Sequence, residues 1–342
     1  KFTVGIKTGY CLQNMILYAR INGLGFDSSY RNKNENRALV TFLVTVDQYK
    51  RMLPGPVFVS GDVKRDTLSG FLQEVKQLVE EMAARIVEDP SIIDSAHHAN
   101  EVAMLTEATI IVQGSDGWQP LFFMIDKCLP EVGAILLVWP KMTICLCQFH
   151  VIQAILRWQT DSGTSEVKPK LSRPAKYLIL WAFRQLQRAR NEEAWKREVE
   201  LFRQRLRKIV SKTNAYHIIR DYFEKNWFCG EWRDLWADIG LPPGHNRDNI
   251  STNNFTERAF KLFDEIFLEN RANKSAYRLV LIIANEWFEY FRHWQPDHKK
   301  RPGAAYHQMI LDGHRLWNSG YAIQDAGHDD QGQRVFKVLA EM

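Results

Sequence analysis

Two short apolar runs on either side of a helical segment constrain the fold of this chain most strongly. The first run, Leu121–Ile125, ends at Asp126, and the second, MTICLC, covers residues 142–147. A helix led by Pro130 is expected between them. A strand, a helix and a strand within about 30 residues predict a βαβ unit, whose strands are parallel and buried on both faces. The pattern therefore predicts an α/β fold in which Asp126 ends a buried parallel strand.

Asp126 places a charge at the end of an apolar strand, and two roles would explain it. In open α/β sheets, ligands bind outside the carboxyl ends of the parallel strands, so the carboxylate could be a ligand. It could also cap the following helix, although Pro130 lies too far along the chain for a good fit. This stretch alone leaves both roles open.

Three extended stretches separated by turn-rich pieces come earlier in the chain. They are GLGFDSSY at residues 23–30, ALVTFLVTVD at 38–47 and GPVFVSG at 55–61. We expect them to form consecutive antiparallel strands. A helix is expected near residues 10–20, and another over residues 66–86, where apolar side chains recur at helical spacing.

Asp27 lies inside the first of these strands, among apolar and small residues. Its carboxylate would interrupt a core strand unless another group paired with it. If the strand that ends at Asp126 lies beside this strand, the two aspartates become neighbours. Two neighbouring carboxylates repel each other, and a divalent metal ion is the usual remedy.

A third carboxylate, Glu257, lies in the stretch STNNFTERAFKLFDEIF, residues 251–267. The apolar stripe of this stretch predicts a helix that packs on the sheet while Glu257 points along the sheet edge. With Asn254 as N-cap, Glu257 would also be the third helical residue, which is the position of a capping-box glutamate. Asp264 or Glu265 could replace Glu257 in a site if the helix were rotated.

Composition limits the classes of protein to which the chain can belong. Its 342 residues, 45% hydrophobic and 25% charged, can bury a large core, which predicts one elaborated domain or two domains. The apolar runs fall short of the roughly 20 residues needed to cross a bilayer, and no signal peptide is evident, so we expect no membrane partner. Five irregularly spaced cysteines suit the reduced thiols of a cytoplasmic or nuclear protein. The sequence starts at Lys1 without a methionine, and we expect it to be part of a longer protein.

Positive charge is concentrated between Lys168 and Lys225. This segment has sixteen Lys/Arg and six Asp/Glu, a net charge of +10, so the rest of the chain carries −5 of the total of +5. The asymmetry favours a polyanionic partner, although solvated helix faces would also explain it. Trp227, Trp232 and Trp236 follow at helical spacing and predict either a helix core or rings that stack on unpaired bases.

The order of these motifs resembles the MULE family of Mutator-like transposases. The stretch FDSSYRNKNENRALVTFLVTVD around Asp27 looks like the family's first-aspartate block, and MIDKCLPEVGAILLVWP contains Asp126. Cys147 and His150 in CLCQFH look like the family's C-x-x-H motif, and STNNFTERAFKLF follows after a long helical stretch. The resemblance implies a ribonuclease H-like fold of the retroviral integrase superfamily, a mixed sheet flanked by helices, with a large all-α insertion before the last acidic residue.

The resemblance further implies a DDE-type DNA transposase whose triad is Asp27, Asp126 and Glu257. These carboxylates would bind two Mg²⁺ or Mn²⁺ ions, hard cations that prefer oxygen ligands, for phosphodiester cleavage and strand transfer at transposon ends. By analogy with ribonuclease H-like enzymes, Asp27 would bridge both ions. DNA as partner, a homo-oligomer in the synapse and a nuclear location are also implied. The alternatives are a domesticated DNA-binding transcriptional regulator that no longer cuts, and a ribonuclease H-like nuclease unrelated to transposition.

Cys147 and His150 have three open roles in this scheme. A zinc site needs about four ligands, and Cys128 and Cys145 are the further cysteines nearby in the sequence. The pair could instead be structural, with His150 a core histidine on its helix, or it could position DNA near the site.

Lys/Arg side chains of the insertion are expected to bind phosphates, which position DNA without reading its sequence. The residues expected to do so are Arg203, Arg205, Arg207, Lys208 and Lys212.

The resemblance, which runs from about Gly23 to Phe291, also sets the expected domain boundaries. They are an N-terminal helical lead-in at 1–20, a ribonuclease H-like core at 21–160 and 248–295, a basic all-helical insertion at 161–247, and a C-terminal helical extension at 296–342. The extension resembles the lead-in to a SWIM zinc module, whose cysteines are not in this sequence.

Overall fold

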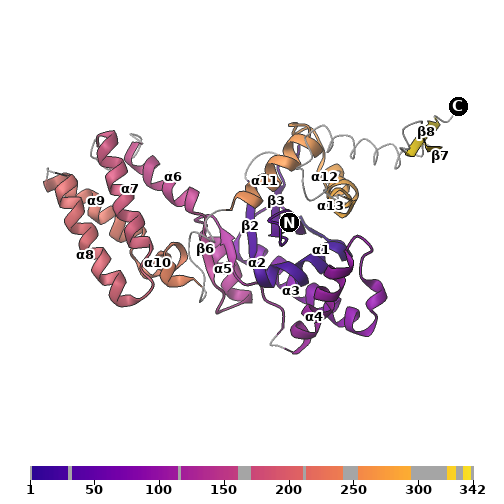
Figure 1. Cartoon of the computed structure of the whole chain (residues 1–342). Coiled ribbons are helices and arrows are strands. Elements are labelled where there is room, and N and C mark those ends of the chain that lie inside the picture. The colour runs from indigo at the N-terminus through magenta and orange to yellow at the C-terminus, as the bar shows by residue number, and fades with distance from the viewer. Residues whose placement is uncertain are drawn as a thin grey trace. The chain divides into compact units, whose positions relative to one another are not determined.

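The computed structural model describes residues 2–29, 33–114, 117–160, 171–210, 213–241, 253–293, 322–328 and 334–339. The chain forms two compact units, one of residues 1–31 and 39–260 and the other of residues 32–38 and 261–342. Figure 1 shows the chain with its helices and strands labelled. No helix in the described part of the chain is long and apolar enough to cross a membrane.

The first unit contains a central sheet, helices that cover it and a helical insertion. Its strands are β1 (Thr3–Ile6), β2 (Leu24–Ser29), β3 (Leu39–Val46), β4 (Met52–Ser60), β5 (Phe123–Ile125) and β6 (Ile144–Leu146). The helices and helical turns around the sheet are α1 (Gly9–Asn14), η1 (Met15–Ala19), α2 (Arg20–Asn22), α3 (Arg65–Glu88), η2 (Pro90–Ile92), α4 (Ala99–Gly114), α5 (Leu129–Val138), α6 (Gln148–Thr160) and α11 (Asn254–Leu262). The insertion contains α7 (Arg173–Gln187), α8 (Glu192–Ile209), α9 (Thr213–Asn226), α10 (Gly230–Trp236) and η3 (Asp238–Gly240).

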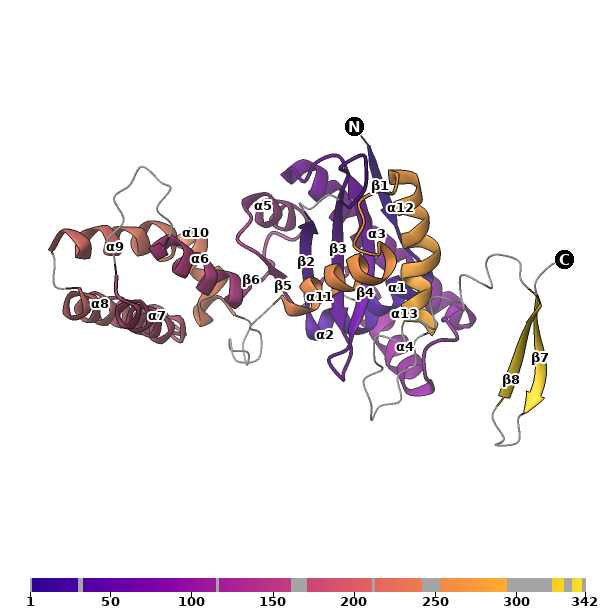
Figure 2. The same cartoon turned by 90° about the horizontal axis from the view of Figure 1, so that it is seen from above.

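Six strands form one mixed sheet in the order β1-β4-β3-β2-β5-β6 (Figure 2). The pairs β1–β4, β4–β3 and β3–β2 are antiparallel, whereas β2–β5 and β5–β6 are parallel. The predicted α/β fold is confirmed, including the three consecutive antiparallel strands and the βαβ unit. Strand β1 and helix α4 were not predicted. Apolar residues are spread around α4, where Ile110 and Ile111 are exposed, so its sequence lacks a one-sided helical stripe.

Helices cover both faces of this sheet. Phe71 of α3 stacks on Phe58 of β4, with ring centroids 4.7 Å apart. Phe260 of α11 packs on Phe42 of β3, also at 4.7 Å. In the sheet, Thr41 of β3 is paired with Phe58 of β4, and the next residue, Phe42, is paired with Asp27 of β2. Because successive side chains point to opposite faces, α3 and α11 cover opposite faces, and α11 shares its face with Asp27.

Aromatic side chains form the core of the insertion. Phe183 of α7 stacks on Trp236 with ring centroids 4.1 Å apart and also contacts Phe223 and Trp227. Trp227, Trp232 and Trp236 are all buried. The helical spacing of these tryptophans therefore reflects a core, which confirms the first of the two predicted alternatives over stacking on bases.

The second unit contains η4 (Phe263–Phe267), α12 (Ala276–Ile282), η5 (Ile283–Trp287), α13 (Phe288–His293), β7 (Ala322–His328) and β8 (Arg334–Leu339). Its core is aromatic: Trp287 contacts Phe263, Phe267 and Phe291. Segment 33–38 joins this unit, since the backbone N–H of Glu35 donates to the carbonyl of Lys274.

Two features of the second unit differ from the predicted domain organisation. Strands β7 and β8 form an antiparallel hairpin, so the predicted helical extension is corrected for residues 322–328 and 334–339. The β8 sequence RVFKVL has two valines and a phenylalanine, which favour a strand over a helix. Residues 261–293 were expected within the core but belong to the second unit, because they pack with residues 33–38.

Candidate active site

Strand register brings the two predicted aspartates together. Strands β2 and β5 pair Gly25 with Met124. The same register continued by two residues puts Asp27 opposite Asp126. The two carboxylates therefore lie at the same edge of the sheet, where parallel strands end.

The neighbouring strand adds Cys147 to this row. Strands β5 and β6 pair Ile125 with Leu146, so Cys147 follows β6 at the level of Asp126. Helix α6 begins at the next residue, and its first turn carries His150. The two residues of the C-x-x-H motif thus lie beside the aspartates.

Helix α11 brings Glu257 to the same place. A Cβ added to Gly25 would lie 2.1 Å from Oγ1 of Thr256 and 2.8 Å from Oδ1 of Asn253, so the start of α11 lies directly against β2. Glycine is required for this approach. The backbone N–H of Glu257 donates to the carbonyl of Asn253 at 3.1 Å, which makes Glu257 the fourth residue of a helix that begins at Asn254. The capping-box explanation, which needs Glu257 in third place after a cap at Asn254, is therefore wrong.

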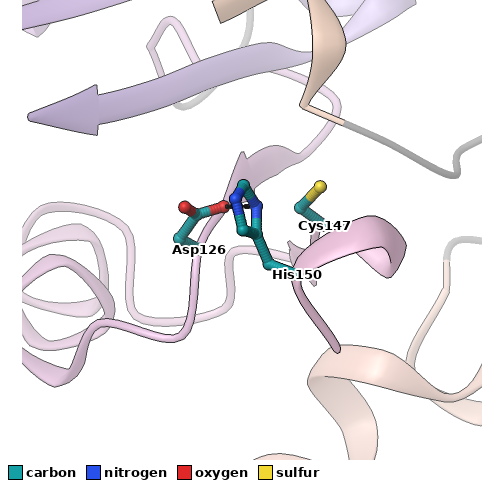
Figure 3. Close-up of side chains that lie close together, drawn as sticks. All are labelled: Asp126, Cys147 and His150. Carbon is teal, nitrogen blue, oxygen red and sulfur yellow. Dashed lines mark ion pairs between the residues drawn. The ribbon is translucent and has the colours of Figure 1, made fainter. Parts of the chain in front are cut away.

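His150 connects two of the carboxylates. Its Nδ1 lies 2.7 Å from Oδ1 of Asp126, and its Nε2 lies 3.6 Å from Oε1 of Glu257. Figure 3 shows the imidazole ring facing the Asp126 carboxylate, with Cys147 on the neighbouring strand end. The shorter contact is an ion pair. Contacts with Asp126 and Cys147 raise the pKa of His150 to about 10, so the ring is positively charged at neutral pH.

Asp27 is close enough to the other acids to be affected by both. Burial, the negative charge of Asp126 and more weakly that of Glu257 raise the pKa of Asp27 to about 7. The backbone N–H of Ser28, which donates to Oδ1 of Asp27 at 2.8 Å, and the charge of His150 oppose this rise. The structure thus brings Asp27, Asp126 and Glu257 into one electrostatic cluster.

A fourth carboxylate, Glu131, lies behind this cluster and was not predicted. It is 1% exposed, in the first turn of α5, and its Oε2 is buried without a hydrogen-bond partner in the described part of the chain. Burial and the negative charges of Asp27 and Asp126 raise the pKa of Glu131 well above its usual range. Helix α5 begins at Leu129 with Cys128 as its N-cap, so Asp126 does not cap this helix.

Cys147 and His150 form a cluster with Asp126 whose ligand atoms are close enough together to hold a metal ion. The ligand atoms of the three residues lie within 4.8 Å of one another. Cys147 is fully buried, and its Sγ accepts the backbone N–H of Asn253 at 3.3 Å. A metal ion would have to displace the proton of the His150 ring. Cys145 and Cys147 both lie in an apolar cluster with Phe122. The structure therefore favours Cys147 as an anchor for the segment that leads into α11.

Lys127, the residue after Asp126, connects the site to the insertion. Its Nζ lies 4.2 Å from the ring centroid of Trp227 and 4.6 Å from that of Trp232, and it donates to the carbonyl of Asn226 at 3.0 Å. Such cation–π contacts are stabilising when the cation is partly desolvated. Burial lowers the pKa of Lys127. The loop that carries Asp126 is thus held against the α9–α10 junction.

Gln148, at the start of α6, makes a second connection of this kind. Its Nε2 donates to the carbonyl of Trp236 at 3.3 Å, and Gln187 of α7 donates to the same carbonyl at 3.1 Å and to Oε1 of Gln148. All of these side chains are buried. The strand ends that carry Asp126 and His150 are therefore both attached to the insertion, which spacing in the sequence could not reveal.

The predicted phosphate-binding residues have unequal surroundings. Arg203 forms an ion pair of 2.7 Å with Glu224, and Arg205 lies 3.7 Å from Glu198 and over the ring of Trp181. Arg207 and Lys208 are exposed, and Lys212 lies outside the described residues. Asp264 and Glu265, which could have replaced Glu257, are paired with Lys33 and Lys261 respectively.

A comparison with models of known protein families matches none of them, and a comparison with curated proteins finds no match either.

Proposed function

We propose that this chain is the catalytic domain of a DDE-type DNA transposase that uses Mg²⁺ or Mn²⁺ to cut and join phosphodiester bonds at transposon ends. The observation that carries this proposal is the convergence of Asp27, Asp126 and Glu257 around His150, from three distant parts of the sequence. The mixed sheet order and the helical insertion between α6 and α11 are compatible with a ribonuclease H-like fold. The sequence motifs that resemble the MULE family contain the same residues.

The donor set of the cluster fits hard divalent cations. Asp27, Asp126 and Glu257 offer carboxylate oxygens, which Mg²⁺ and Mn²⁺ prefer. Repulsion within the cluster contributes to the raised pKa of Asp27, and Oε1 of Glu257 is buried without a hydrogen-bond partner among the described residues. Bound cations would relieve both features. Two such ions would lower the pKa of an attacking water or 3′-hydroxyl and stabilise the leaving oxygen.

The side chains of the site have distinct roles in this proposal. Asp27, which is affected by both other acids, is suited to a shared position between two ions. The charged ring of His150 offsets the charges of Asp126 and Glu257 and keeps them together when no cation is present. Lys127 and Gln148 hold the loops after β5 and β6, so that Asp126 and His150 keep their positions.

Mn²⁺ binding in the presence of a short DNA duplex tests the proposed metal site. We expect Asp126→Asn and Glu257→Gln to lose the Mn²⁺ binding that the wild type shows as attenuation of the free Mn²⁺ signal in electron paramagnetic resonance. Glu265→Gln is the matched control and should keep it, because Glu265 pairs with Lys261 at 3.8 Å. Nicking of supercoiled DNA in Mn²⁺ should fall at least about 100-fold in the first two variants and in Asp27→Asn.

The products distinguish the proposed transposase from the two alternatives. Joined strands in addition to nicks support a transposase, whereas nicks alone favour a nuclease unrelated to transposition. A wild-type protein that binds duplex DNA, but neither binds Mn²⁺ nor cleaves the DNA, would overturn the proposal in favour of a DNA-binding regulator.

A further inference from the structure

Helix α7 presents an exposed face that the proposed catalytic chemistry does not use. Its opposite face, which includes Ile179, Phe183 and Leu186, is buried in the insertion core. On the exposed face, Tyr177 is 53% and Trp181 is 51% exposed. Half-exposed aromatic rings one helical turn apart contrast with the buried tryptophans of the same insertion.

Basic side chains surround these two rings. Residues 171–190 contain five Lys/Arg and no Asp/Glu. Arg173, Arg184 and Arg188 are exposed and lie at helical spacing from the rings. Within the described residues, Arg184 and Arg188 have no ion-pair partner, and Arg173 contacts only Tyr177, over whose ring it lies at 5.7 Å.

This face differs in charge from the neighbouring helix α8. In α8, Arg203 is paired with Glu224, and Glu192 and Glu193 occupy the first turn. Arg205 lies over the Trp181 ring at 5.0 Å, so it adds a further positive charge to the α7 face. The α7 face therefore has positive charge and no acidic residue of its own, whereas α8 carries charges of both signs, including its exposed Arg207 and Lys208.

We infer that the Tyr177–Trp181 face of α7 binds a single-stranded DNA segment, with bases stacked on the two rings and phosphates on the surrounding arginines. This inference rests on the proposed function, since cleavage and joining at DNA ends expose unpaired nucleotides. Arginines that track a backbone, together with aromatic rings that stack on bases, are the elements of single-strand binding. A second copy of this chain fits less well, because two α7 faces related by a two-fold axis would bring like charges together.

Fluorescence anisotropy with a labelled oligo-dT strand, and with a duplex of the same length, tests the inference in EDTA. We expect Tyr177→Ala and Trp181→Ala to weaken binding to the single strand about 5- to 100-fold each, and binding to the duplex much less. Tyr277→Ala is the matched control, because Tyr277 is 74% exposed on α12, and it should leave both affinities unchanged.

The arginines are tested by the salt dependence of the same binding. Arg184→Ala and Arg188→Ala should reduce the slope of log affinity against log salt, by about 0.7 per contact with a single strand, whereas Arg203→Ala should not. Equal losses in the Tyr277→Ala control, or unchanged single-strand affinity in both α7 aromatic variants, would overturn the inference. The inference would also be overturned if Tyr177→Ala and Trp181→Ala changed only the oligomeric state in sedimentation, because the α7 face would then be a protein interface.

These outcomes are separate from those of the proposed function. Single-strand binding is measured without metal ions, so a protein that fails to bind Mn²⁺ or to nick DNA can still bind a single strand through α7. A wild-type protein that nicks DNA but binds no single strand would leave the proposed function standing and overturn this inference.

Discussion

The first unit contains two clusters of buried or partly buried acidic side chains that are built in opposite ways. Glu101 of α4 has a donor for each carboxylate oxygen: the Tyr18 hydroxyl donates to Oε1 at 2.6 Å, and the backbone N–H of His98 donates to Oε2 at 2.9 Å. Nδ1 of His97 lies 3.8 Å from Oε2. Burial alone would raise the pKa of Glu101, but the contacts with His97, Tyr18 and His98 lower it to about 2.

The candidate active site has more carboxylates than donors. Asp126 and Glu257 share one charged histidine, whose charge also acts on Asp27, and the pKa values of Asp27 and Glu131 are raised. A buried carboxylate with donors stabilises the fold, whereas carboxylates that face one another reduce stability. Stability therefore explains the Glu101 cluster. The site cluster needs another explanation, which the proposed binding of cations would supply.

The largest loss of stability is expected when Glu101 is substituted. Glu101→Gln should lower the free energy of unfolding by about 2–3 kcal/mol at pH 7, because the amide N–H₂ would face a buried donor. Urea unfolding measures the difference, and Glu107→Gln, at an exposed position of the same helix, is the control.

The pH dependence gives the sign of the Glu101 contribution. Its pKa is lowered from 4.5 to about 2 by folding, so its stabilisation is complete above about pH 4.5 and is lost as the pH falls toward 2. The difference between wild type and Glu101→Gln should shrink over that range. A difference that stays constant from pH 6 to pH 3 would contradict the assignment of Glu101 as a structural anion.

Substitution of Asp27 is expected to change stability in the opposite direction, by increasing it. Its pKa is raised from 3.8 to about 7 by folding, so the folded wild type loses stability as the pH rises from about 4 to 7. Asp27→Asn should therefore be more stable than wild type at pH 8, by up to about 4 kcal/mol for the full pKa shift, and equal to it near pH 4. Thermal unfolding in EDTA measures the gap, with Asp66→Asn, whose side chain is 83% exposed, as the control. If Asp27→Asn were less stable than wild type at pH 8, the hydrogen-bond donors around Asp27 would outweigh the repulsion from its neighbouring acids.

The sheet and the meeting of Asp27 with Asp126 could be predicted because both follow from local patterns. Apolar runs and turn residues define the strands, and parallel strands end at one edge of a sheet. Glu257 was harder to place, because the direction of its side chain depends on the residue at which α11 begins. That start is determined by Gly25 of a distant strand, against which the helix lies.

Glu131, Lys127 and the exposed face of α7 could not be predicted, for a common physical reason. A glutamate in the first turn of a helix is ordinary in sequence, and only the tertiary fold puts Glu131 behind two aspartates. Likewise, aromatic residues at helical spacing predict a buried stripe. The fold buries Trp227 and Trp236 but leaves Tyr177 and Trp181 on the surface.

The smallest change in the free energy of unfolding is expected for Glu131→Gln, which is the same type of substitution as Glu101→Gln. Burial and the charges of Asp27 and Asp126 raise the pKa of Glu131 well above its usual range, which favours the neutral form of its side chain. Glutamine has nearly the same shape and no charge, so Glu131→Gln should change the free energy of unfolding by less than about 0.5 kcal/mol. Glu131→Ala should cost about 2 kcal/mol, because it leaves a cavity at a position that is 1% exposed. If Glu131→Gln instead cost as much as Glu101→Gln, Glu131 would be an ionised acid with its own donors, and the site would contain a structural anion like that of α4.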